Sequence, residues 1–247
     1  MLTGKKILVT GASSGIGRAC SIYFSELGAK IVLVGRNLER LEKSLSMMSG
    51  SGHFFVQTDL GKSEDIPVLF EKSTADGIKL DGMVHCAGIP YILPLKSMTK
   101  ERLEHVMNIN FYSYVELCRQ FVKKQFSNDL SSIVGISSGA AKHPGPYELG
   151  YVASKAAMEA ATKVIAQEYG KRKIRANCVE PALVKTELVE SVISNLQNNS
   201  LIQEQVNKSI FGWIKPEEIA HACAFLLSDT SIPMTGKVLE VDSRCVY

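Results

Sequence analysis

Short runs of β-branched and aliphatic residues recur along this chain, and longer stretches with helical periodicity separate them. Runs such as 30–34, Lys-Ile-Val-Leu-Val, are apolar at nearly every position, which is typical of a strand buried on both faces of a sheet. Strands that alternate with helices form parallel sheets, because right-handed crossovers place the helices on both faces. The sequence therefore predicts a doubly wound α/β fold.

The expected elements fill most of the chain. The strands are predicted at 6–9, 30–34, 53–57, 83–86, 132–136, 174–179 and 238–241, and the helices at a first segment ending near Leu27 and at 37–48, 63–74, 100–108, 110–126, 151–169 and 216–227. A chain of 247 residues fits one large domain, which we expect to span 1–247. The segment 187–213 mixes apolar and polar residues and is expected to be a substrate lid.

A glycine-rich turn follows the first predicted strand and opens a helix, with the sequence Thr10-Gly11-Ala12-Ser13-Ser14-Gly15-Ile16-Gly17. Glycines at such a turn permit a tight bend, let backbone N–H groups approach a pyrophosphate, and let the helix pack against the sheet. The helix N-terminus adds partial positive charge where phosphates would bind. The spacing Gly-x-x-x-Gly-x-Gly differs from the general Gly-x-Gly-x-x-Gly fingerprint, so a tight loop without a ligand is the alternative.

Tyr151 and Lys155 stand four positions apart at the start of a long predicted helix, and residues at this spacing share one helix face. A tyrosine normally loses its proton near pH 10, and a fixed cation nearby lowers that pKa. The pair therefore predicts general acid/base chemistry by the phenol. Tyr147 is a poorer candidate, because the residue four positions after it is Tyr151 rather than a lysine.

Together these motifs resemble those of the classical short-chain dehydrogenase/reductase family, and the resemblance extends from Gly11 to Asp242 with the elements in the expected order. The family fold is a single Rossmann-like domain with a seven-stranded parallel sheet, which agrees with the pattern above. The resemblance implies that Tyr151 is the proton donor and acceptor and that Lys155 also holds the nicotinamide ribose.

The resemblance implies two further catalytic residues. Ser138 follows the fifth predicted strand and corresponds to the serine that binds the substrate oxygen, whereas its neighbour Ser137 should turn away. Asn110 corresponds to the asparagine that holds a helix bend and a water of the proton relay, with Asn108 as the runner-up. Tyr-x-x-x-Lys is common by chance, but its combination with these residues and the glycine-rich turn is specific.

The resemblance also implies a set of cofactor contacts, namely Gly11, Ser13, Ser14, Gly15, Ile16, Gly17, Arg36, Asp59, Leu60, Ala87, Gly88, Tyr151, Lys155, Pro181, Val184 and Thr186. In dinucleotide folds an acidic residue after the second strand binds the ribose 2′-hydroxyl of NAD. Here that position corresponds to Gly35, and Arg36 follows, whose guanidinium could bind a 2′-phosphate. We therefore expect NADP(H) rather than NAD(H), with a solvated Arg36 as the alternative.

Asp59 corresponds to the aspartate that binds the adenine amino group, and support of the next helix is its alternative role. Three positions depart from the family pattern. Cys86 replaces an asparagine, Ala182 replaces the glycine after Pro181, and Ser243-Arg244 replaces Gly-Gly at an end that forms a tetramer interface in many relatives. These departures bear on cofactor binding and on assembly.

Composition excludes several other classes of protein. The net charge is +3, too small a surplus to indicate a nucleic-acid partner. The six cysteines form no Cys-x-x-Cys pair and no cluster with histidines, which argues against a metal site and favours a reducing compartment. We expect no signal peptide, because the first residues lack its basic-then-apolar plan, and no apolar run reaches about 18 residues. We expect a cytoplasmic protein without membrane contacts that forms a homo-oligomer, either a tetramer or a dimer.

The expected function is NADP(H)-dependent hydride transfer between nicotinamide and a carbonyl or secondary alcohol carbon of a small molecule, with ketones, including 3-oxoacyl groups, as the leading substrates. A secondary alcohol, sterol or sugar dehydrogenase that uses NAD is the nearest alternative, since one site can run both ways. A dinucleotide-sensing protein without catalysis is the alternative from another class, because a fold does not fix a function.

Overall fold

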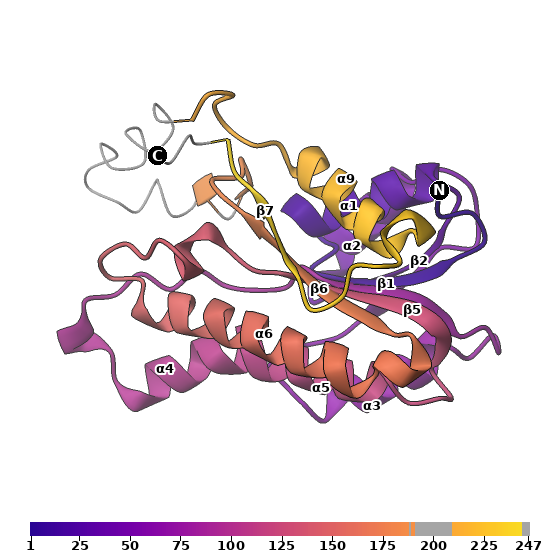
Figure 1. Cartoon of the computed structure of the whole chain (residues 1–247), viewed down its shortest axis with the longest axis horizontal. Coiled ribbons are helices and arrows are strands. Elements are labelled where there is room, and N and C mark those ends of the chain that lie inside the picture. The colour runs from indigo at the N-terminus through magenta and orange to yellow at the C-terminus, as the bar shows by residue number, and fades with distance from the viewer. Residues whose placement is uncertain (188, 191–208, 244–247) are drawn as a thin grey trace.

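A computed structural model describes residues 1–187, 189–190 and 209–243, and most of the expected lid lies outside the described residues. Its sheet has seven parallel strands in the order β3-β2-β1-β4-β5-β6-β7 (Figure 1). The strands are β1 (Lys6–Thr10), β2 (Lys30–Gly35), β3 (Phe54–Gln57), β4 (Leu80–His85), β5 (Ser127–Ile136), β6 (Arg175–Pro181) and β7 (Val238–Val241). The expected doubly wound fold is confirmed.

Helices cover both faces of this sheet (Figure 1). One face carries α1 (Gly15–Glu26), α2 (Leu38–Ser46) and α9 (Pro216–Leu227). The other carries α3 (Asp65–Ser73), α4 (Lys100–Met107), α5 (Ser113–Phe121) and α6 (Leu149–Glu168). No helix within the described parts of the chain is long and apolar enough to cross a membrane.

Each face of the sheet has its own apolar core, because the strand residues alternate between the two. Ile7 and Val9 pack with Phe24 and Ile219 on the α1 and α9 face. Leu8 belongs to the opposite core, which contains Phe70, Phe121 and Met158 among others. Burial of one such side chain contributes about 1.5–3 kcal/mol, so these two layers supply most of the force that closes the sheet between its helices.

Several expected boundaries differ from the structure. β5 begins at Ser127 rather than at 132. The prediction missed its first residues because most of them are polar, and they precede a register shift between Leu80 and Gly82 of the neighbouring strand. α5 ends at Phe121 rather than at 126. α6 begins at Leu149, so the first helical turn already contains Tyr151. The break predicted between 108 and 110 is a π turn, Asn108–Tyr112, inside a continuous helical segment.

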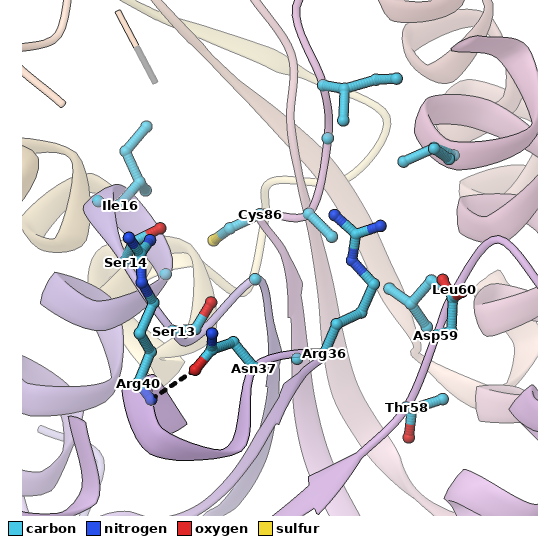
Figure 2. Close-up of a pocket in the computed structure, with 18 of the residues that line it drawn as sticks. Ser13, Ser14, Ile16, Arg36, Asn37, Arg40, Thr58, Asp59, Leu60 and Cys86 are labelled. Carbon is cyan, nitrogen blue, oxygen red and sulfur yellow. Dashed lines mark hydrogen bonds between the residues drawn. The ribbon is translucent and has the colours of Figure 1, made fainter. Parts of the chain in front are cut away.

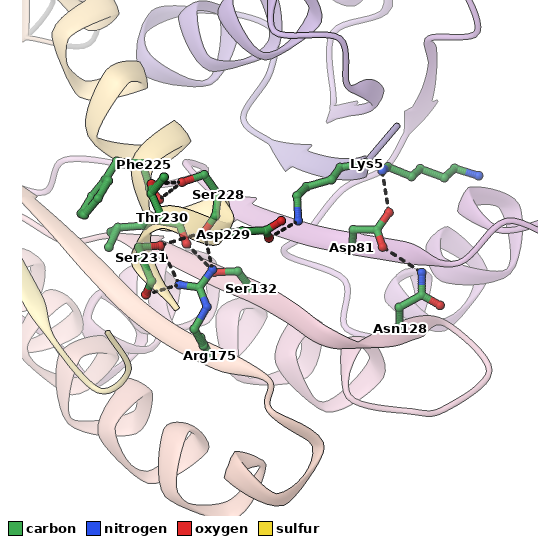
Figure 3. A network of polar contacts seen from close by, with 12 residues as sticks. Lys5, Asp81, Asn128, Ser132, Arg175, Phe225, Ser228, Asp229, Thr230 and Ser231 are labelled. Carbon is green, nitrogen blue, oxygen red and sulfur yellow. Dashed lines mark hydrogen bonds and ion pairs between the residues drawn. The ribbon is translucent and has the colours of Figure 1, made fainter. Parts of the chain in front are cut away.

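Polar side chains at the amino end of the sheet form a network of hydrogen bonds and ion pairs (Figure 3). The Arg175 guanidinium donates to the Ser231 hydroxyl at 2.9 Å and to the Ser228 carbonyl at 3.1 Å. The Lys6 amine, which is nearly fully buried, reaches the Asp76 carboxylate at 2.6 Å. Buried polar groups need such partners, so this end is built for stability.

Candidate active site

A cavity of about 430 Å³ lies at the carboxyl ends of β1, β2, β3 and β4 (Figure 2). The glycine-rich turn forms one wall, Thr58 to Gly61 form another, and Cys86 to Ile89 close the side that leads toward α6. Thr186 and Arg40 also line this cavity. The crevice beyond the carboxyl ends of the strands is where parallel α/β sheets bind ligands.

The glycines of the turn are held in conformations and contacts that other residues resist. Gly11 has a φ of +66°, and a Cβ at this position would lie 2.8 Å from the Ala87 nitrogen. A Cβ at Gly17 would lie 2.3 Å from the Gly11 carbonyl oxygen, because α1 begins against the turn itself. Ser14, the N-cap of α1, makes no side-chain cap, so the first N–H groups of this helix lack that partner. These features fit a bound pyrophosphate.

Arg36 and Asp59 lie on separate walls of the cavity (Figure 2). The Arg36 guanidinium makes no hydrogen bond within the described residues, while its backbone carbonyl accepts from Gln57 at 2.8 Å. The Asp59 carboxylate accepts from the Gly61 N–H at 3.0 Å, and the N-cap of α3 is Glu64. Asp59 therefore does not cap α3, and its carboxylate faces the cavity together with Leu60.

α6 places Lys155 one turn after Tyr151, with the Lys155 nitrogen 5.8 Å from the centroid of the phenol ring. Lys155 is 4% exposed, and its amine donates to the Ile136 carbonyl at the end of β5, at 2.7 Å. A Cβ at Gly88 would lie 3.3 Å from the Asn110 amide oxygen and 3.5 Å from the Lys155 nitrogen. The cavity wall, Asn110 and Lys155 therefore meet at one point.

The two serines after β5 face different neighbours. The buried Ser137 hydroxyl donates to the Glu159 carboxylate, so it turns away from the cavity. Ser138 is only partly buried, and its hydroxyl accepts from the Ala140 N–H at 3.2 Å. The Ser138 hydroxyl also lies close enough to the Tyr151 phenol to affect its pKa.

Asn110 occupies the π turn between α4 and α5, and its side chain is fully buried. Its amide accepts from the Ile89 N–H at 2.8 Å and donates to the Ile89 carbonyl at 3.0 Å and to the Ser154 hydroxyl at 3.0 Å. Asn108 instead donates to the Gly61 carbonyl at 2.7 Å, beside the cavity wall. Asn110 is thus the one of the two that joins the wall after β4 to α6.

The electrostatics of the pair differ from expectation. Burial raises the pKa of Tyr151, and the hydrogen bond with Ser138 only partly opposes this rise. Burial also lowers the pKa of Lys155 to about 8. The expected lowering of the Tyr151 pKa does not appear in the chain without cofactor, because burial dominates and the Lys155 amine is directed at the Ile136 carbonyl.

The three predicted contacts after β6 lie at different depths. Pro181 is the last residue of that strand, and Val184 is buried and forms a bridge with Ile214. Thr186 lines the cavity and would lie 3.3 Å from a Cβ at Gly15. Ala182 keeps this loop on β7 through a 3.1 Å hydrogen bond to the Val241 carbonyl. With Ala182 in place of the usual glycine, the loop after β6 still brings Thr186 next to the glycine-rich turn.

Two groups of residues beside the site were absent from the sequence-based prediction. His85 is fully buried at the end of β4, and its Nδ1 lies 2.9 Å from the Thr10 hydroxyl. Arg18 and Arg40 are both bound by Glu187. His85 could have been noticed as a polar residue ending an apolar strand, but nothing local in the sequence joins Glu187 to residues so distant.

Metal chemistry has no support in this site. Across residues 1–187, 189–190 and 209–243 no group of three or more His, Cys, Asp or Glu side chains could hold a metal ion. Cys86, at the cavity, and the buried Cys20, Cys118, Cys178 and Cys223 are all free thiols.

Comparison with known proteins places this geometry among oxidoreductases. The family model described as enoyl-(acyl carrier protein) reductase matches residues 11–243. A glucose 1-dehydrogenase of Gluconobacter oxydans (strain 621H) is 32% identical over 97% of this chain and 91% of its own length. The 3-oxoacyl-(acyl-carrier-protein) reductase FabG of Chlamydia trachomatis serovar D is 32% identical over 98% of this chain and 97% of its own. The solved structure of a short-chain type dehydrogenase/reductase from Mycobacterium ulcerans superimposes with a TM-score of 0.88 at 26% identity, covering 98% of this chain and 90% of that one.

Proposed function

This chain belongs to the short-chain dehydrogenase/reductase family of oxidoreductases, and on that premise we propose that it is an NADP(H)-dependent reductase of ketones. The observation that carries the proposal is the meeting of Gly88, Asn110 and Lys155 where the glycine-turn cavity reaches α6, with Tyr151 one turn earlier. A non-catalytic sensor of dinucleotides would have no need of this proton-transfer set.

When bound, NADP(H) would supply the hydride, and the residues of this chain would orient the reactants and move the proton. Ser138 and Tyr151 would bind the carbonyl oxygen of the substrate, and Tyr151 would deliver its proton to that oxygen. Lys155 would hold the nicotinamide ribose and favour the phenolate that remains. Asn110 would fix the bend through which a proton returns from solvent.

The preference for NADP(H) rests on the end of β2. A Cβ at Gly35 would lie 3.2 Å from a Leu41 methyl carbon and 3.5 Å from the Ser13 side chain, so an acidic residue there would be crowded. The Arg36 guanidinium next to it is free to bind a phosphate, since no described residue engages it. An arginine in this position suits a dianionic 2′-phosphate through several charge-assisted hydrogen bonds.

An apolar substrate is favoured by a second cavity of about 470 Å³ beside the start of α6. Its lining is mainly apolar and consists of Leu93, Leu95, Pro144, Gly145, Tyr147, Glu148, Leu149, Val152 and Ala153. A 3-oxoacyl chain would fit this lining better than a sugar, although the similarity to a glucose 1-dehydrogenase makes a sugar alcohol the second candidate.

We further propose a single domain over 1–247 with a lid over 187–213, acting as a cytoplasmic homo-oligomer.

The proposal is tested by Tyr151→Phe, with Tyr169→Phe as a matched control that removes a phenol hydroxyl at the opposite end of α6. NADPH oxidation is followed with a panel of 3-oxoacyl esters, cyclic ketones and keto sugars, and cofactor binding is measured by NADPH fluorescence. We expect Tyr151→Phe to lower kcat at least ~100-fold with NADPH affinity retained, and Tyr169→Phe to keep the rate. Equal rates in all three proteins would refute the role of Tyr151, and NADPH binding without turnover of any substrate would favour the sensor.

A further inference from the structure

Glu187 connects two arginines beside the glycine-turn cavity, which Arg40 lines. One of its carboxylate oxygens lies 3.0 Å from Arg40 Nη1, and the other lies 3.5 Å from Arg18 Nη1. Arg18 belongs to α1 and Arg40 to α2, while Glu187 follows β6 directly after the cavity residue Thr186. The carboxylate therefore ties the segment that leaves β6 to the two helices flanking the glycine-rich turn.

The two arginines are held in different ways. The Arg18 side chain is 18% exposed, and it donates through Nε to the Ser44 hydroxyl at 3.1 Å and through Nη2 to the Ser13 carbonyl. The Arg40 side chain is 55% exposed and has Glu187 as its partner among the described side chains. Arg18 thus has a structural role, whereas the Arg40 guanidinium is available to any anion that can displace Glu187.

Arg40 and Arg36 line the same cavity, and a short turn connects them along the chain. The Asn37 side chain accepts from the Arg40 N–H at 2.9 Å, so the chain between the two arginines is held at the start of α2 (Figure 2). The remaining N–H groups at that helix start add partial positive charge on the same side. Arg36 and Arg40 therefore both add positive charge to the lining of this cavity, to which Asp59 adds a carboxylate.

We propose that Arg40 is a second cation for the 2′-phosphate of NADP(H), beside Arg36, and that Glu187 occupies this arginine when no phosphate is bound. The inference rests on the proposed NADP(H)-dependent function. An exposed ion pair such as Arg40–Glu187 is weak, so it yields readily to a stronger anion. A phosphate ester carries nearly two negative charges and accepts several hydrogen bonds from a guanidinium. The 2′-phosphate should therefore displace the Glu187 carboxylate from Arg40.

Competition of this kind has a signature that a merely structural ion pair lacks. Loss of the Arg40 charge should weaken only the dinucleotide that bears the 2′-phosphate. Loss of the Glu187 charge should strengthen that same dinucleotide, because its competitor is gone. NAD⁺ lacks the 2′-phosphate, so its affinity should respond to neither change.

The test measures Kd values for NADP⁺ and NAD⁺ by calorimetry with the full chain and with Arg40→Gln, Glu187→Gln and the double variant. Arg40→Gln should weaken NADP⁺ at least ~10-fold and change NAD⁺ less than ~2-fold. Glu187→Gln should tighten NADP⁺ roughly 3-fold, and this gain should vanish in the double variant because the two residues act on one group. Arg119→Gln, which removes an exposed arginine of another ion pair, Arg119–Glu116, is the control and should change neither affinity.

Three results would overturn the inference. NADP⁺ and NAD⁺ could weaken equally in Arg40→Gln, Glu187→Gln could leave NADP⁺ affinity unchanged, or its effect could persist without Arg40. Arg36→Gln separates this failure from failure of the proposed function. If the unmodified chain binds NADP⁺ and only Arg36→Gln weakens it, Arg40 is not a phosphate ligand and the function stands. If the unmodified chain binds neither dinucleotide, both proposals fail.

Discussion

The two ends of the sheet treat buried charge in opposite ways. At the amino end the Lys6 amine meets a carboxylate and a carbonyl. The Arg175 guanidinium there meets two serine carbonyls and a hydroxyl (Figure 3). At the carboxyl end the Lys155 amine has the Ile136 carbonyl as its one hydrogen-bond acceptor among the described residues. The His85 Nε2 has no partner among these residues, and neither do the Ser127 and Ser131 hydroxyls nearer the amino end. Both ends lie in the same fold and are covered by the same helices.

This difference separates the buried cations that stabilise the fold from those that are available for binding or catalysis. A buried donor without a partner costs about 1–3 kcal/mol, and a buried, weakly partnered amine has a lowered pKa. Such groups persist where a ligand or a reaction can use them, so perturbed residues gather at functional sites. Variants at the amino end should therefore lower the free energy of unfolding and keep activity. Variants at the carboxyl end should lower activity and keep or raise the free energy of unfolding.

The largest effect is expected for Lys155→Met. Turnover should fall at least ~1,000-fold, since both the cation beside Tyr151 and the ribose contact are lost. The thermal stability of the cofactor-free chain should stay equal or rise at pH 7, because a costly buried charge is removed. The folded pKa of Lys155 is about 8 against 10.5 for the free group, so the unfolded chain binds the extra proton between these values. The free energy of unfolding of the unmodified chain should thus rise with pH in this window, and that rise should be absent in Lys155→Met.

At the other end, Arg175→Met should lower the free energy of unfolding by about 2–4 kcal/mol, because the carbonyls of Ser228 and Ser231 lose a charged donor. Urea denaturation at pH 7.5 measures the loss, and kcat per folded molecule should remain within ~2-fold. A fall in kcat at full folding would show that the two ends are coupled, contrary to the comparison.

A smaller effect is expected for His85→Asn. Burial lowers the pKa of His85 to about 3, so between pH 6.5 and this value the unfolded chain binds a proton that the folded chain does not. Falling pH therefore destabilises the unmodified chain by up to about 1.4 kcal/mol per pH unit through this residue. Urea denaturation at pH 7 and pH 5 should show a shallower loss in His85→Asn than in the exposed-site control His105→Asn.

The smallest effect belongs to Lys5→Ala, which removes the exposed 2.9 Å ion pair with Asp229 at the amino end. We expect a loss below about 1 kcal/mol that disappears in 1 M salt, because water and ions screen such a pair. A loss as large as that of Arg175→Met would mean that the amino-end network is cooperative rather than divided into buried and exposed parts.

Local patterns predict the fold because each strand and helix carries its own periodicity. The glycine-rich turn and the Tyr151–Lys155 pair were likewise visible as short motifs, and Gly88, which lines the cavity of that turn, lies next to Lys155. The pairing of Glu187 with Arg40 could not be predicted, since it depends on how two loops distant in sequence approach each other. The rise of the Tyr151 pKa in the cofactor-free chain could not be predicted, because burial depends on tertiary packing rather than on spacing.

The π turn at Asn108–Tyr112 limits how this chain can change in length. A π turn holds one residue more than regular helical geometry would, and the buried Asn110 side chain within it reaches Ile89 and Ser154. Deletion of one residue from this turn would restore ordinary winding and rotate the Asn110 amide by about 100°. The Ile89 backbone would then lose both of its hydrogen bonds to that amide. Deletion of a single residue here would thus disrupt the site while the helix itself remains.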